Sequence, residues 1–85
     1  MTRFDIIELF KAELTEKQLP LRLFAVDEME DHFLITVCGG NNGHPDWPQY
    51  LRSVALLMEG HDWWLVDITN DRLDDLHSVT IGVEK

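Results

Sequence analysis

Residues 21–38 read LRLFAVDEMEDHFLITVC, and this stretch decides the fold. Two runs rich in aliphatic and aromatic residues, 21–27 and 32–38, flank an acidic turn that extends to Asp31, as in an antiparallel hairpin. Successive strand residues point to opposite faces, so Phe33, Ile35 and Val37 share one face of the second strand. His32, Leu34, Thr36 and Cys38 share the other face. The stretch therefore predicts half of a sheet that has two distinct faces.

Residues 4–18 precede the hairpin and have a helical pattern. Their apolar side chains recur at spacings of three, four and seven, namely at Phe4, Ile6, Ile7, Phe10 and Leu14. Thr2 and Asp5 have the spacing of a capping box, with Asp in place of Glu. Pro20 cannot continue a helix, so the helix is expected to end before it.

Residues 48–58 form the second predicted helix. An apolar stripe at helical spacing consists of Trp47, Tyr50, Leu51, Val54, Ala55 and Met58. Pro48 suits a first helical turn, and Gly60 suits a helix stop. The alternative is a strand that turns through residues 59–62 into the next strand.

Two more strands complete the expected order. Residues 61–69 are apolar on both faces apart from Asp67, which is typical of a central strand covered on both sides. Residues 77–83 place Val79, Ile81 and Val83 on one face, after a polar turn or single helical turn at 70–76. The order helix-strand-strand-helix-strand-strand predicts one α+β domain over residues 1–85. Its mostly antiparallel four-stranded sheet carries both helices on one face.

Charge limits the choice of partners. Sixteen Asp and Glu stand against seven Lys and Arg, a net charge of −9. Such a surface repels nucleic acid and anionic membranes and attracts basic proteins. The N-terminus lacks the apolar core of a signal peptide, and the longest apolar run, 54–58, is far too short to span a membrane. We expect a soluble cytoplasmic protein.

No catalytic, cofactor or metal site is predicted. Cys38 and His44 lie six residues apart, but no third group is identifiable to orient the imidazole. The metal-capable side chains of His44, Asp46, His61 and Asp62 lack the spacing of a zinc site. The glycine-rich stretch 39–43 lacks the spacing of a phosphate-binding motif. The chain is therefore not expected to be an enzyme.

Two acidic turns, a loop and a Trp pair are the predicted binding features. Adjacent strand residues point to opposite faces, so one ring of Trp63-Trp64 should enter the core and the other should lie on the open face. Trp is enriched at interface hot spots. The predicted contact residues are Asp27, Glu28, Glu30 and Asp31 in the first turn, Asn41, Asn42, His44 and Trp47 in the loop, Trp63, and Asp71, Asp74 and Asp75 before the last strand.

These features indicate a small, non-catalytic protein-binding module. An inhibitor, immunity protein or anti-defence protein that binds a basic surface fits this size and charge, including the basic surface of a nucleic-acid-binding enzyme. A sharper form of this hypothesis is mimicry of a phosphate backbone. The alternative is a homodimer or larger oligomer that associates through its Trp-bearing sheet face. The acidic turns form one binding surface only if they converge in the fold.

Overall fold

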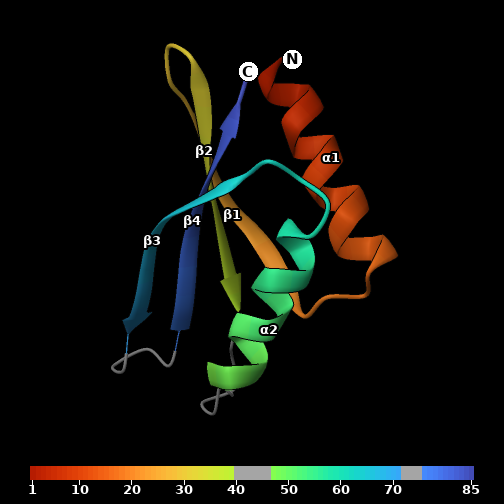
Figure 1. Ribbon diagram of the computed structural model, residues 1–85, viewed down its shortest axis with the longest axis vertical. Helices are drawn as coiled ribbons and strands as arrows, with labels where there is room; N and C mark the ends of the chain where they lie inside the picture. The colour runs from red at the N-terminus through yellow and green to blue at the C-terminus, as the bar shows by residue number, and fades with distance from the viewer. Residues whose placement is uncertain (40–46, 72–75) are drawn as a thin grey trace.

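The computed structural model describes residues 1–39, 47–71 and 76–85, which form two helices and one sheet (Figure 1). The elements in chain order are α1 (Arg3–Glu16), β1 (Leu21–Glu28), β2 (His32–Gly39), α2 (Trp47–Met58), β3 (Trp64–Asp71) and β4 (Leu76–Glu84). The predicted α+β class and element order are confirmed, and residues 48–58 are helical rather than extended. Within these segments no helix is long and apolar enough to cross a membrane.

The sheet has the order β1-β2-β4-β3, and every neighbouring pair is antiparallel. The two predicted hairpins, β1–β2 and β3–β4, are both present. They join through β2 and β4, which pair continuously from His32 opposite Glu84 to Gly39 opposite His77. The central positions therefore belong to β2 and β4. The prediction that residues 61–69 form a central strand is wrong, because β3 lies at an edge of the sheet and begins only at Trp64.

Both helices cover the same face of the sheet. The core contains Phe33, Ile35 and Val37 of β2 and Val79, Ile81 and Val83 of β4, together with Ile6 and Phe10 of α1 and Tyr50, Val54 and Leu57 of α2. The predicted alternation in β2 and β4 is thus confirmed. Figure 1 shows the two helices towards the β1 side of the sheet, with β3 at the opposite margin. The helical layer therefore leaves β3 comparatively uncovered.

Local interactions define the ends of the helices. The Thr2 hydroxyl accepts a hydrogen bond from the Asp5 amide (3.2 Å), and the Asp5 carboxylate accepts one from the Thr2 amide (2.9 Å). The predicted capping box is present, and these hydrogen bonds hold the pKa of Asp5 below its ordinary value. After α2 the chain turns at Gly60, whose φ of 83° lies in the left-handed region that favours glycine. On α2 itself, the Tyr50 hydroxyl donates to the Val37 carbonyl (3.0 Å) and fastens the helix to β2.

Neighbouring leucines of α2 offer a matched test of this packing. Leu57 is fully buried, whereas Leu56 is 44% exposed. Leu57→Ala should lower the free energy of unfolding by about 2–5 kcal/mol, because it leaves a cavity in the core. Leu56→Ala should change it by less than about 0.5 kcal/mol. Urea denaturation followed by circular dichroism measures both, and equal losses would contradict the assigned face of α2.

Candidate protein-binding surface

Edge strand β3 carries a concentration of exposed apolar side chains. Trp64 is 39% exposed, Leu65 48%, Val66 47% and Ile68 41%. Leu65 is opposite the core residue Ile81, so by register it lies on the helix-covered face of the sheet. Ile68 pairs in the same way with Val79. Since neither side chain is buried, the helical layer does not fully cover β3.

The open face of β3 presents Trp64. Its pairing partner is Gly82, and a Cβ added to Gly82 would overlap the Trp64 ring. The indole therefore lies directly against the backbone of β4. The His32 ring of β2 is tilted against it, with ring centroids 5.8 Å apart. The Trp64 ring is thus supported by the β4 backbone at Gly82 and by the His32 ring, and it remains accessible to a partner.

Trp63 has a different role from the one predicted for it. Its ring stacks on Phe10 of α1, with centroids 4.4 Å apart, and on His61, with centroids 3.8 Å apart. Trp63 is half-buried and packs against the core. The prediction that the two rings separate is confirmed, but the ring on the open face belongs to Trp64. As a contact residue, Trp63 offers an accessible edge rather than a free face.

The first acidic turn and Asp71 lie at opposite ends of the sheet. The turn between β1 and β2 lies at the end of the sheet where His32 pairs with Glu84. Asp71 pairs with Leu76 at the opposite end. The eight residues of β2 separate these ends by about 25 Å at ~3.3 Å per residue, roughly three Debye lengths at physiological salt. Asp71 therefore lies far along the sheet from the first turn, while Asp74 and Asp75 lie outside the described residues.

Two carboxylates of the first turn already have partners within the chain. The Glu28 carboxylate lies 2.8 Å from Lys85 Nζ, and the Asp31 carboxylate bonds with the His32 ring. These contacts lower the pKa of both carboxyl groups. Asp27 and Glu30 are exposed. The turn thus keeps only part of its formal charge for a partner.

Several predicted residues are not placed by the structure. Asn41, Asn42, His44, Asp74 and Asp75 lie outside the described residues, and only the backbone is described for Trp47 and Asp71. Cys38 is buried, and burial raises the pKa of its thiol, which opposes a reactive thiolate. The part of the chain that the structure describes contains no group of three or more metal-ligating side chains.

A polar tie joins α1 to the start of β3. His61 Nε2 lies 2.8 Å from Glu13 Oε1, and Lys17 Nζ lies 3.0 Å from Glu13 Oε2. Lys17 also donates to the carbonyl of Leu56 at the end of α2 (2.8 Å). The hydrogen bonds from Lys17 and then His61 hold the pKa of Glu13 below its ordinary value of 4.5. The candidate His61 is therefore engaged structurally.

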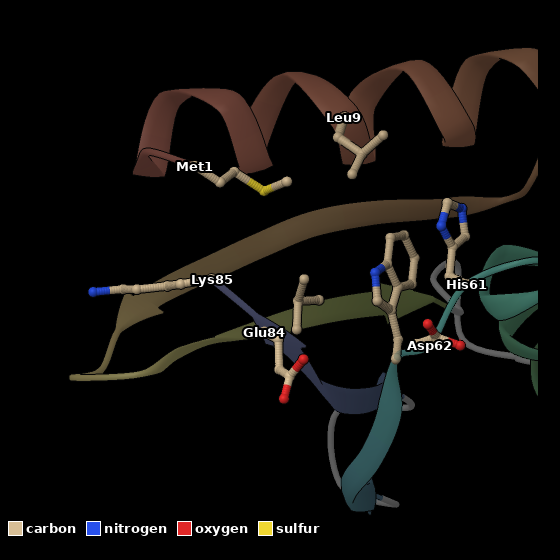
Figure 2. Close-up of a pocket in the computed structure, with 8 residues that line it drawn as sticks. Met1, Leu9, His61, Asp62, Glu84 and Lys85 are labelled. Carbon is tan, nitrogen blue, oxygen red and sulfur yellow. The ribbon is translucent and has the colours of Figure 1, made fainter.

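A hollow lies beside this tie, between α1, the start of β3 and the end of β4 (Figure 2). Its volume is about 350 Å³, and it is lined by Met1, Leu9, His61, Asp62, Trp63, Val83, Glu84 and Lys85. The sequence had singled out Asp62 only as a metal-capable side chain. Nothing in the sequence pattern indicated the hollow, because its lining comes from three separate segments.

The tie predicts a pH dependence of stability. Because the pKa of Glu13 is lower in the folded than in the unfolded chain, its stabilising contribution is present above pH 4.5 and is lost as the pH falls below that value. When the pH is lowered from about 5 to about 3, the free energy of unfolding of Glu13→Gln should therefore fall less than that of the unaltered protein. Urea midpoints at the two pH values measure this difference. The exposed Glu16, on the same helix, supplies the control Glu16→Gln, which should keep the full dependence.

Comparisons with known proteins add no relative to these observations. No family model, curated protein or solved structure matches this chain. The function must therefore be inferred from the chemistry and geometry of the chain's own residues.

Proposed function

We propose that this protein is a small acidic, non-catalytic module that binds a basic protein surface through β3 and its surroundings. The observation that carries the proposal is the exposure of four large apolar side chains on one edge strand, at 39–48% each. The segment 61–71 that contains them has three Asp and no Lys or Arg. Apolar contact area and negative charge thus occur together.

The apolar side chains supply affinity in this proposal. Clustered exposed apolar side chains on a small domain are a typical mark of an interaction site. Trp64 is the strongest anchor, since Trp is enriched among residues that dominate binding energy. Its support by Gly82 and His32 limits the rotamer entropy that binding would cost.

The charge supplies steering and selectivity. A net charge of −9 attracts a basic partner over a distance and raises its association rate. Asp62 and Asp67 are exposed within and beside β3, so negative charge also lies at the contact area. An inhibitor or immunity protein that occupies the basic surface of a nucleic-acid-binding enzyme fits this combination. The proposal includes a cytoplasmic setting, which suits the free thiol of Cys38.

Self-association through Trp64 is the second candidate function, because the same open face would serve it. Two copies each carrying −9 repel one another, so added salt should strengthen a homodimer. Salt should instead weaken binding to a basic protein. Salt dependence therefore separates the two functions.

Capture of a partner from cells that express the protein tests the proposal. Tagged protein should retain a basic protein at low salt and lose most of it at about 0.5 M salt, where screening is strong. Replacement of two exposed β3 residues, Val66→Ser with Ile68→Ser, should reduce capture at least about fivefold. Phe24→Ser, at a 69%-exposed position on the opposite edge strand, is the control and should leave capture unchanged.

The partner must be identified by mass spectrometry and reconstituted with the pure protein. The proposal is overturned if capture is unchanged by added salt, by the Val66→Ser, Ile68→Ser double replacement, and by neutralisation of the acidic turn. The turn residues to be neutralised are Asp27, Glu28, Glu30 and Asp31. Sedimentation of the protein alone at micromolar concentration tests the second function. A dimer that strengthens with salt and is broken by Trp64→Ser would favour self-association.

A further inference from the structure

The indole of Trp64 lies flat on the open face of the sheet, the face opposite the two helices. A Cβ built on its pairing partner Gly82 would meet three atoms of the ring, Cε2, Cζ2 and Nε1. Cε2 is the nearest of the three, and its two bonded neighbours are equally distant at 2.5 Å. An approach in the plane of the ring would instead bring these neighbours at least as close as Cε2. One face of the ring therefore rests on the β4 backbone at Gly82.

The other face of this indole is accessible. Trp64 is 39% exposed although Gly82 lies beneath it. The His32 ring meets it at one side, with 49° between the ring planes and 5.8 Å between the centroids. An indole that is supported below and open above is a platform on which a cationic group can stack. Glycine at position 82 allows this arrangement, because any larger residue would displace the ring.

Carboxylate side chains flank the platform on the same face. Alternation along β4 puts Glu84 on the same face as Gly82, roughly 7 Å further along the strand. Asp67 pairs with Thr80, which is two residues from Gly82 in the other direction, so Asp67 is also on this face. Both acidic side chains are exposed. A cation held over the indole therefore lies between two positions that carry negative charge.

Positive charge is scarce on the open face. Among the basic side chains that the structure describes, register and alternation put only Arg22 there, on β1, the edge strand opposite β3. Lys85 Nζ lies 5.4 Å from the ring centroid of the core residue Phe33, on the helix-covered face. The His32 ring bonds with the Asp31 carboxylate, which balances any charge on the imidazole. The platform is thus complementary to a cation.

We propose that the Trp64 indole receives an arginine side chain of the basic partner, and this inference rests on the function proposed above. The guanidinium group stacks on the open face of the ring, and the negative charge of Glu84 and Asp67 favours it there. Arginine suits the platform better than lysine, because its planar group stacks on an aromatic face and is more weakly hydrated than an ammonium. A nucleobase could also stack, but its phosphates would meet the carboxylates.

Titration with small probes tests the platform without the partner. Nα-acetyl-L-arginine amide, added to isotope-labelled protein at constant ionic strength, should give saturable chemical-shift changes at the Trp64 indole N–H. The variant Trp64→Leu identifies this signal by removing it. Nα-acetyl-L-citrulline amide has nearly the same planar shape without the charge, so it should bind at least about fivefold more weakly.

Two matched aromatic replacements locate the binding. Trp64→Leu keeps an apolar side chain but removes the indole, so it should weaken arginine binding at least about fivefold, measured at the amides of His32 and Gly82. Phe24→Leu removes a 69%-exposed ring from the opposite edge strand and should alter binding less than about twofold. The inference is overturned if the arginine probe gives no saturable shifts, if citrulline binds equally, or if the two replacements have equal effects.

Gly82→Ala tests the flat position of the ring. The added Cβ displaces the indole, so arginine binding should fall at least about threefold. In the Trp64→Leu background the same change should have no further effect, because no ring is left to displace. Equal losses in the two backgrounds would mean that Gly82 acts through the fold, which contradicts the platform.

A charge-matched pair of variants tests the flanking carboxylates. Asp67→Asn with Glu84→Gln should weaken arginine binding about threefold and leave citrulline binding unchanged. Glu8→Gln with Glu16→Gln makes the same charge change at exposed positions of α1, on the other side of the sheet, and should have a smaller effect. Equal effects of the two pairs would contradict a local role of Asp67 and Glu84.

The two proposals fail in different ways. If a basic protein is captured through β3 but the arginine probe does not bind, the function stands and Trp64 is not an arginine platform. If the probe binds at Trp64 but no basic protein is captured, the proposed function fails and the indole remains a guanidinium site. Probe binding at Trp64, together with capture that Trp64→Leu reduces and Phe24→Leu does not, supports both.

Discussion

The stacked contact between Phe10, Trp63 and His61 is the interaction on which the rest of the surface depends. It holds the chain against α1 just before β3 begins, with ring separations of 4.4 Å and 3.8 Å. Glu13 and Lys17 fasten the same point to α1 and to the end of α2. Because Trp63 is turned towards the helices, strand alternation places Trp64 on the open face. One packing contact thus sets both the orientation of β3 and the position of the hollow.

Much of the fold follows from local patterns in the sequence. The alternation of Phe33, Ile35 and Val37 is visible without a structure, and so is the Thr2–Asp5 capping box. The position of β3 is not, because it depends on the pairing of β2 with β4, whose paired residues lie 38 to 52 positions apart in the chain. A strand that is apolar on both faces has the same sequence pattern whether it is central or an uncovered edge. The pattern therefore identified β3 as a strand but assigned it the wrong place.

The candidate site shows the same limit. Sequence position alone could show that one of two adjacent Trp rings would face outwards, but not which one, because the start of β3 is fixed by tertiary contacts. It also showed two acidic turns, but not that Asp71 lies at the far end of the sheet from the first turn. The described acidic residues consequently lie at both ends of the sheet, so the acidity of this chain has more than one location. Its local effect near β3 comes from Asp62 and Asp67, while the total charge acts as a general field.

The edge of β3 is better suited to side-chain contacts than to pairing with another strand. A bulge between Leu65 and Asp67 shifts the register, and Asp67 Oδ1 accepts a hydrogen bond from the Ile68 amide (2.9 Å). A bulge and a charged residue are common protection against edge-to-edge aggregation, because they interrupt the row of free backbone groups. Neither device covers Trp64, Leu65, Val66 or Ile68. A partner can therefore bind here by contacting these side chains and the carboxylates beside them. A further β-strand cannot pair as well, because the edge of β3 is interrupted.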